Sequence, residues 1–273
     1  MKASTEVTGT TRVLLPQGVD GALWSDRYRS GVFRFNGRPL RIDVADDEDV
    51  LFPSDCGLSL LAALGQPPAI RFTGRRVLDI GCGSGLYTVA ALADGAAQVT
   101  ALDINAQALD ATARNVRTNG LPADRLQCVG TGLADYHPRR GQGFDVIVTN
   151  PPHLPSDRAY SAEHGLKQAL IGGDDGRQLY DIVIDRVPDL LAQDGVVLVA
   201  HSSLANVPQT VSRMARLGFA ERTLSVTEMD IPLRAYGDHA GVVLERLAVL
   251  RRERRAEFSQ RRFSVHVLAF SRP

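Results

Sequence analysis

The segment from Val77 to Gly85 reads V-L-D-I-G-C-G-S-G and is the strongest indication of the fold in this sequence. Its first four residues are the apolar run of a buried strand, and the glycines that follow form a turn that opens a helix. Glycine lets the backbone bend sharply and approach a ligand closely, while the N-terminus of the next helix supplies N–H donors. The segment therefore predicts a strand, a ligand-binding loop and a helix.

A carboxylate ends the next predicted strand. Asp103 follows Gly81 at a distance of about 20 residues, where an acid can accept hydrogen bonds from both hydroxyls of a ribose. A dinucleotide-binding loop would need glycine at position 86, but this chain has Leu86 there. The spacing is D-x-G-x-G-x-G, which disfavours a dinucleotide enzyme.

Apolar strands alternate with amphipathic helices between residues 75 and 202, and this order predicts an α/β fold with a parallel sheet and helices on both faces. The expected strands are Arg76–Ile80, Gln98–Ile104, Leu126–Val129, Phe144–Thr149 and Gly195–Ala200. The expected helices are Leu86–Ala93, Ala106–Asn119, Gly176–Leu191 and Ala205–Leu217, with Asn119-Gly120 and Asp194-Gly195 as stop signals.

Further elements are expected on both sides of this region. Tyr28–Val44 predicts a β-hairpin around an Asn36-Gly37 turn, and Asp49–Pro53 is expected to be a loop beside the ligand. Glu221–Leu233 and Arg262–Phe270 are expected to be the last strands, separated by a helical insertion at about 240–258. We divide the chain into an N-terminal extension, residues 1–70, and a main domain, residues 71–273, and expect residues 1–20 to be loosely ordered.

A second motif ends the strand that begins at Phe144. The chain reads F-D-V-I-V-T-N-P-P-H from Phe144 to His153, and it places Asn-Pro-Pro at the carboxyl edge, where open α/β sheets bind ligands. The prolines fix an extended turn whose carbonyl groups have no sheet partner. The Asn150 side-chain oxygen and the Pro151 carbonyl can accept both hydrogens of a planar –NH2 group, while His153 packs on it. The motif predicts an acceptor site for a nitrogen.

The glycine loop resembles motif I of the Rossmann-like methyltransferases that bind S-adenosylmethionine (SAM). Asn150-Pro151-Pro152 resembles the N-P-P-Y/F/W signature of amino and amide N-methyltransferases, which include N6-adenine DNA enzymes, guanine-N2 rRNA enzymes and release-factor glutamine methyltransferases, the HemK-like family. The last group is most similar, because it shares the short hairpin, a segment like Val50–Asp55 and the A-L-x-G-G-x-D-G element of Ala169–Gly176.

The resemblance covers about Tyr28 to Phe219 and implies a class I methyltransferase with a mostly parallel seven-stranded sheet. It implies SAM as cofactor and S-adenosylhomocysteine as product. The expected catalytic residues are Asn150, Pro151 and His153. The expected cofactor-binding residues are Asp79, Gly81, Gly83, Gly85, Asp103, Ile104, Thr131 and Asn150. The expected substrate-binding residues are Phe52, Pro152, His153, His201, Glu228 and Asp230. The histidine spacing predicts no metal site.

Departures from the family pattern lie on the acceptor side. His153 replaces an aromatic residue, Ser54 stands where arginine is usual, and the helical N-terminal domain that recruits release factors has no counterpart. We therefore expect an N-methyltransferase that acts on an amide, amino or guanidino nitrogen of a small molecule. The insertion is expected to be a lid, a helix packed on the sheet edge or a dimer contact. The alternatives are a protein-(glutamine-N5) methyltransferase that acts on a release factor, an RNA or DNA amino methyltransferase, and a non-catalytic SAM-binding subunit.

Composition limits the partners and the compartment. The chain has 31 basic and 31 acidic residues, and this balance argues against a nucleic-acid partner bound through its phosphates. No apolar run is long enough to span a membrane. Cys56, Cys82 and Cys128 are far apart and form no C-x-x-C pair, as expected in a reducing cytoplasm. The sequence leaves the oligomeric state open.

Overall fold

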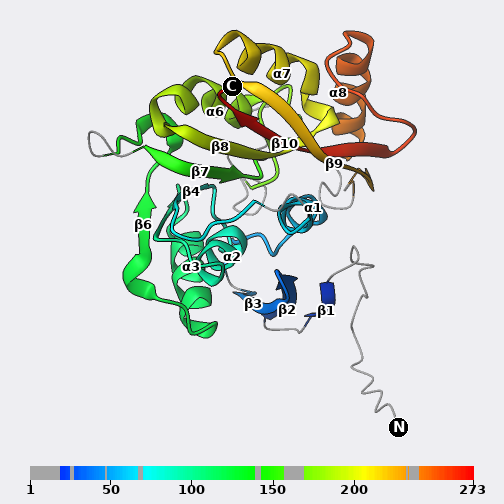
Figure 1. The fold of residues 1–273 in the computed structure, drawn as a ribbon. Coiled ribbons are helices and arrows are strands. Elements are labelled where there is room, and N and C mark those ends of the chain that lie inside the picture. Colours follow the sequence, from blue (N-terminus) through cyan, green and yellow to red (C-terminus); the bar gives the residue numbers. More distant parts are fainter. Residues whose placement is uncertain are drawn as a thin grey trace.

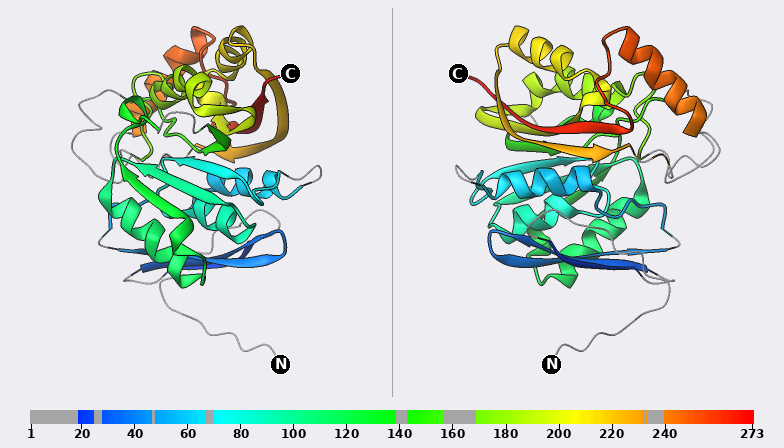
Figure 2. Two further views of the ribbon diagram at one scale, coloured as in Figure 1. Left: turned by 60° about the vertical axis from the view of Figure 1, so that its left-hand side comes forward. Right: turned by 90° about the vertical axis from the view of Figure 1, so that its right-hand side faces the viewer.

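A computed structural model describes residues 19–24, 28–46, 48–66, 70–138, 143–156, 169–231, 233 and 240–273. These residues form a seven-stranded sheet covered by helices and a separate three-stranded antiparallel sheet that forms an outer layer (Figures 1 and 2). The α/β fold with a mostly parallel seven-stranded sheet is therefore confirmed. The division at residue 70 stays a prediction, and most of the segment expected to be loosely ordered lies outside the described residues.

The large sheet has the order β6-β5-β4-β7-β8-β10-β9. Its strands are β4 (Arg76–Ile80), β5 (Gln98–Asp103), β6 (Leu126–Gly130), β7 (Phe144–Thr149), β8 (Leu191–Ser202), β9 (Ala220–Asp230) and β10 (Arg262–Ser271). β10 runs antiparallel to both of its neighbours, whereas the pairs from β6 to β8 are parallel. The chain order reverses between β4 and β7, so their carboxyl ends flank the crevice where such sheets bind ligands.

Residues that alternate along each central strand enter two different halves of the core. In β7, Val146 and Val148 pack on one face and Ile147 packs on the other. The first face is covered by α1 (Asp55–Leu64), α2 (Leu86–Ala93) and α3 (Ala106–Thr118). The second face is covered by α6 (Gln178–Leu190) and α7 (Val207–Arg216), as Figure 2 shows. Burial on both faces explains why these strands are rich in valine, isoleucine and leucine.

The predicted hairpin is confirmed by β2 (Tyr28–Phe35) and β3 (Arg38–Ala45). Asn36 and Gly37 both have positive φ, 49° and 79°, which is the turn geometry that an Asn-Gly pair favours in hairpins. A third strand, β1 (Val19–Trp24), was not predicted. The hairpin packs on α2 and α3, and the Asn115 and Asn119 side chains hydrogen-bond to the β3 backbone.

One predicted helix stop was wrong, and one helix was missed. Asp194-Gly195 does not end a helix: α6 stops at Leu190, and Gly195 lies inside β8. A Cβ on Gly195 would lie 2.9 Å from the Phe144 carbonyl oxygen, so the glycine permits a close approach of β8 to β7. Helix α1 was not predicted either, although Ser54 is its N-cap and accepts a hydrogen bond from Gly57 N.

The insertion contains α8 (Ala240–Arg252), which is preceded by residues outside the description. Val243, Leu247 and Leu250 are buried and belong to the same core cluster as the hairpin and α1. Since this apolar stripe is already packed, α8 is part of the body of the domain. Among the described helices, none is long and apolar enough to cross a membrane.

Candidate functional site

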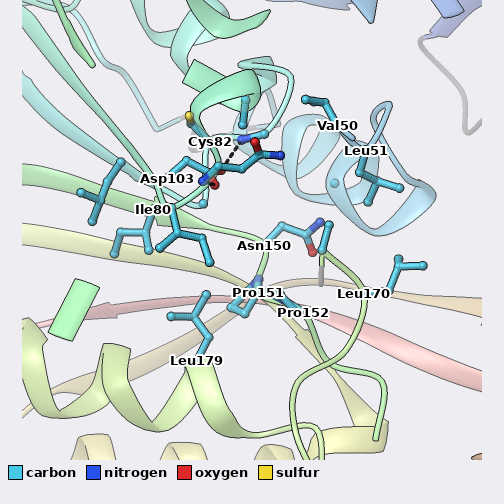
Figure 3. Close-up of a pocket in the computed structure, with 18 of the residues that line it drawn as sticks. Val50, Leu51, Ile80, Cys82, Asp103, Asn150, Pro151, Pro152, Leu170 and Leu179 are labelled. Atoms are coloured by element: carbon cyan, nitrogen blue, oxygen red, sulfur yellow. Dashed lines mark hydrogen bonds between the residues drawn. The ribbon is translucent and has the colours of Figure 1, made fainter. Parts of the chain in front are cut away.

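A cavity of about 510 Å³ opens at the carboxyl ends of β4, β5 and β7. Figure 3 shows Asp103 on one side, Asn150, Pro151 and Pro152 on another, and Leu51 and Leu170 at a third. These side chains come from segments far apart in the sequence, which the sheet topology brings to one edge. The size is typical of a small-molecule or cofactor site.

The glycines of the loop have two different structural roles. Gly81 and Gly83 line the cavity with φ of 68° and 52°, and a Cβ on Gly81 would meet no atom within 4 Å. Gly85 does not line the cavity. A Cβ there would lie 2.9 Å from Thr112 Cα, and its N–H donates to the Cys82 carbonyl. The expected cofactor contact of Gly85 is therefore not supported, because this glycine packs α2 against α3.

Asp103 fixes the loop and also faces the cavity. Its Oδ2 accepts a hydrogen bond from Gly83 N at 3.0 Å, and its Oδ1 accepts one from Asn105 N at 2.9 Å. A carboxylate has about four acceptor positions, so the two hydrogen bonds to Gly83 and Asn105 do not exhaust its capacity to accept. Burial raises the pKa of Asp103 above its usual value, although its backbone hydrogen bonds oppose the shift. Ile104 and Thr131 also line the cavity beside Asp103.

Asp79 lies beneath the loop and does not line the cavity. Its Oδ2 accepts hydrogen bonds from the backbone N and the hydroxyl of Thr88, at 3.0 and 2.7 Å. Its Oδ1 is buried and has no hydrogen-bond partner among the described residues. Burial is the main cause that raises the pKa of Asp79 to about 7. The expected role in binding the cofactor directly is replaced by a role in joining β4 to α2.

The acceptor motif presents one unused oxygen. Asn150 Oδ1 is buried and has no hydrogen-bond partner in the described part of the chain. The Pro151 carbonyl lies 3.1 Å from His153 Nδ1, and since a carbonyl only accepts, Nδ1 carries the proton. Burial lowers the pKa of His153 to about 4, so the ring is neutral near pH 7 with its Nε2 lone pair available. The Pro151 carbonyl retains a second lone pair.

Several lining residues were absent from the predicted site. The cavity wall includes the backbone turn at Gly57, the Tyr87 side chain, and Leu170, Gln178 and Ile182. Tyr87 donates a hydrogen bond to the Gly57 carbonyl at 3.0 Å and thereby ties α2 to α1. The sequence did contain a signal for some of these residues. The family-like segments Val50–Asp55 and Ala169–Gly176 both contribute to the cavity wall.

Phe52 and Pro152 line the cavity as expected, but three predicted substrate-binding residues lie elsewhere. His201 is buried against Tyr180, with ring centroids 3.9 Å apart, and its Nε2 lies 2.7 Å from Thr210 Oγ1. Burial lowers the pKa of His201 to about 3. Glu228 and Asp230 lie on the edge strand β9 and form ion pairs with Arg262. The described residues of the insertion do not line the cavity, so the lid interpretation is not supported either.

Comparisons with known proteins assign this site to a family. Residues 61–151 match the family model for ribosomal protein L11 methyltransferase (PrmA). The chain is 32% identical over 179 residues to human methyltransferase HEMK2, a match that covers 64% of this chain and 82% of the human protein. The chain belongs to the HemK-like family of SAM-dependent methyltransferases. This HemK-like chain is also 35% identical over 199 residues to the release factor glutamine methyltransferase of Rhodospirillum rubrum.

The R. rubrum match covers 69% of the HemK-like chain and 59% of that enzyme. A third relative, the ribosomal protein uL3 glutamine methyltransferase of Bordetella pertussis, is 40% identical over 133 residues, or 45% of this chain and 42% of the relative. The solved structure of a Thermus thermophilus 16S rRNA N2 G1207 methyltransferase, in complex with AdoMet and guanosine, shares the fold with a TM-score of 0.52. Its sequence identity is 18%, and the match covers 91% of this chain and 52% of that chain.

These relatives overturn the expectation of a small-molecule acceptor. The names of two of them give protein substrates, a release factor and ribosomal protein uL3. The HemK-like protein is a SAM-dependent N-methyltransferase. The small-molecule interpretation had rested on the balanced charge, on the expected lack of a recruitment domain, and on the departures at Ser54 and His153. The structure shows why these departures carry little weight: Ser54 caps α1, and His153 retains an aromatic ring beside the acceptor oxygens.

The cavity fits SAM. Gly81 leaves open space where a side chain would stand, and Asp103 lines the cavity as an acceptor for the ribose hydroxyls. The Asn150 oxygen, which has no hydrogen-bond partner in the described part of the chain, lies in the same cavity. These residues would hold the cofactor on the β4 and β5 side and would leave the β7 side for the acceptor.

Proposed function

We propose that this HemK-like enzyme methylates the N5 nitrogen of a glutamine side chain in a protein. The observation that carries the proposal is the buried Asn150 Oδ1, which has no hydrogen-bond partner among the residues that the structure describes and adjoins the Pro151 carbonyl at the end of β7. A buried acceptor without a partner costs about 1–3 kcal/mol, so a site that retains one is suited to a ligand that donates. A primary amide donates two hydrogen bonds in one plane.

SAM, when bound, supplies an electrophilic methyl group on sulfur. Asn150 Oδ1 and the Pro151 carbonyl accept the two N–H groups of the amide and thereby orient the nitrogen. An amide nitrogen is a weak nucleophile because its lone pair is delocalised into the carbonyl, so fixed orientation supplies much of the rate. We assign Asn150 and Pro151 to this role.

Attack makes the amide nitrogen cationic and its protons strongly acidic. No strong base is then needed, and the proton can leave to water or to the neutral His153 ring. Nε2 is the free acceptor of that ring, because Nδ1 is engaged with the Pro151 carbonyl. We assign cofactor binding to Gly81, Gly83, Asp103, Ile104 and Thr131, which line the other part of the cavity.

The remaining acceptor-side wall is largely apolar. Leu51, Phe52, Pro152 and Leu170 line it. Such a wall accommodates the methylene groups of a glutamine side chain while the amide reaches Asn150. A single side chain buries little area, so affinity for a protein substrate must come from contacts outside the cavity.

Transfer of labelled methyl from SAM tests the proposal. The full chain is incubated with a purified class 1 release factor, purified uL3, total RNA and a mixture of amino acids, and the modified residue is mapped by mass spectrometry. We expect one methyl group on a glutamine side chain of a protein, and no label with the Asn150→Ala variant. Label only in RNA or only in amino acids would contradict the proposal.

A further inference from the structure

The acceptor motif rests on a second stretch of backbone. We call Asn150–Leu154 the acceptor segment and residues 170–176 the bracing loop. His153 N and Leu154 N donate to the Leu170 carbonyl at 3.2 and 2.9 Å, and Gly172 N donates to the Leu154 carbonyl at 2.9 Å. Leu154 and Ile171 form a short parallel bridge. These hydrogen bonds fix the path of the acceptor segment after β7 ends.

No side chain separates the two stretches at the bracing loop's glycines. A Cβ on Gly172 would lie 2.5 Å from the Pro152 carbonyl oxygen, and one on Gly176 would lie 2.3 Å from the His153 carbonyl oxygen. Contact of backbone with backbone transmits displacement directly, because no flexible side chain can absorb it. A shift of the bracing loop therefore displaces Pro152 and His153, which directly follow the two residues that carry the acceptor oxygens.

The insertion holds the bracing loop at two consecutive residues. Arg246 of α8 donates through Nε to the Asp174 carbonyl at 2.7 Å. Arg255, just after α8, pairs with Asp175 Oδ2 at 2.5 Å. The other carboxylate oxygen of Asp175 accepts from Arg177 N at 3.1 Å. Two arginines about 70 to 80 residues downstream thus tie the loop to the insertion.

The insertion is itself fixed to the core. Its apolar stripe is buried, and Glu257 N donates to the Ser203 carbonyl at 2.8 Å while Ser203 Oγ donates to the Glu257 carbonyl. At the end of the bracing loop, the buried Arg177 side chain donates to the Asn206 carbonyl at 2.9 Å. The bracing loop is therefore held between two rigid supports.

We infer that Arg246 and Arg255 are positioning residues for methyl transfer, which act through the bracing loop on Asn150 and Pro151. The inference depends on the proposed function only for the roles of those two acceptor residues. The Arg255 side chain is 40% exposed, and an ion pair as exposed as the one between Arg255 and Asp175 contributes little to the free energy of unfolding. A displacement of about 1 Å at the reacting group can lower a rate about 100-fold. Loss of either arginine should therefore affect turnover much more than stability.

Steady-state kinetics of four variants test this inference. Arg246→Ala and Arg255→Ala should each lower kcat on the acceptor protein by roughly ten-fold, with SAM affinity unchanged and KM nearly unchanged. Arg255→Lys, which keeps the charge, should recover part of the rate. Arg252→Ala removes an exposed arginine from the last turn of α8 and is the matched control, with wild-type kcat.

A spectroscopic measurement separates this inference from the proposed function. The side-chain amide signals of Asn150 are assigned by their loss in Asn150→Ala and are followed by NMR in the SAM-bound chain. They should shift in Arg246→Ala and Arg255→Ala and stay in place in Arg252→Ala. If no acceptor protein is methylated but these signals shift, the proposed function fails and the positioning role stands. The positioning role would be overturned if the enzyme is active and the Arg246 and Arg255 variants match Arg252→Ala both in kcat and in the Asn150 signals.

Discussion

At the scale of single residues, one carboxylate orders the glycine loop and faces the ligand. Asp103 binds the backbone N–H groups of Gly83 and Asn105 and retains acceptor positions toward the cavity. The same group therefore shapes the loop before the cofactor arrives and accepts the ribose hydroxyls afterwards. Such preorganisation lowers the ordering cost of binding.

Replacing Asp103 by alanine should weaken SAM binding by about 1–3 kcal/mol, or roughly 5- to 150-fold in Kd, because hydrogen bonds to a charged acceptor are lost. Isothermal titration calorimetry measures the effect. Asp110→Ala removes an exposed acid from α3 and should leave Kd unchanged. Equal Kd values for the folded Asp103→Ala variant and the wild type would remove Asp103 from the cofactor site.

The raised pKa of Asp79 should make the free energy of unfolding depend on pH. Burial raises its pKa from 3.8 to about 7 in the folded chain, so the folded state holds a proton that the unfolded state releases. The free energy of unfolding should therefore fall as pH rises from about 4 to 7, and the loss should be complete above pH 7. In Asp79→Asn this contribution is absent.

The measurement is the difference in Tm between Asp79→Asn and the wild type, recorded from pH 5 to pH 8. The contributions of groups that both proteins share cancel in this difference. They include His153 and His201, whose lowered pKa values make the free energy of unfolding rise with pH below pH 6.5. The difference should grow in favour of Asp79→Asn as pH rises. A difference that stays constant over this range would show that Asp79 does not titrate there.

At the level of secondary-structure elements, the bracing loop can be tested by a substitution at Gly176, with the same substitution at Gly218 as the control. Gly176 and Gly218 both have strongly positive φ, 75° and 84°, but a Cβ on Gly176 would collide with the acceptor segment, whereas one on Gly218 would meet nothing within 4 Å. Alanine at either position carries a backbone cost of about 1 kcal/mol. Only Gly176→Ala should also displace Asn150 and Pro151.

We therefore expect Gly176→Ala to lose most of kcat while binding SAM normally, and Gly218→Ala to show a smaller loss in Tm with wild-type kcat. Calorimetry and initial-rate assays on the two variants decide between these outcomes. If both variants keep full kcat, the collision at position 176 is absorbed without moving the acceptor oxygens.

The elements that sequence predicted well are those with a local signal. The apolar run and glycine turn of β4 and α2, the Asn36-Gly37 hairpin and the alternation of β10 depend on neighbouring residues. The start of β8 was predicted wrongly, because Gly195 looks like a helix stop but is required by the approach of another strand. Long-range contacts of this kind leave no pattern in the local sequence.

The predicted site shows the same division. Glycines and acids at strand ends were found from their spacing, and most of them line the cavity. His201 was assigned because it ends a predicted strand, but it is buried in the core. Glu228 and Asp230 were assigned as acids that could pair with a cationic substrate, but they pair with Arg262 instead. Arg246 and Arg255 could not be identified as partners of the bracing loop, since the contact joins residues about 70 to 80 positions apart.

At the scale of the whole molecule, acceptor recognition must extend beyond the cavity. A glutamine side chain fills only a small part of an interface, and stable protein complexes bury about 800 Å² per partner. A peptide of about five residues that contains the acceptor glutamine should therefore show a KM far above that of the folded protein, by roughly 100-fold. Initial rates over a range of peptide and protein concentrations measure this ratio.

The most direct test of the account is single-turnover methyl transfer by Asn150→Ala with SAM prebound and the identified acceptor protein in excess. We expect a Kd for SAM close to the wild-type value and a transfer rate at least 100-fold lower, because Asn150 orients the acceptor nitrogen in the transition state. A folded variant that binds SAM and transfers methyl to the same glutamine at the wild-type rate would contradict the central claim.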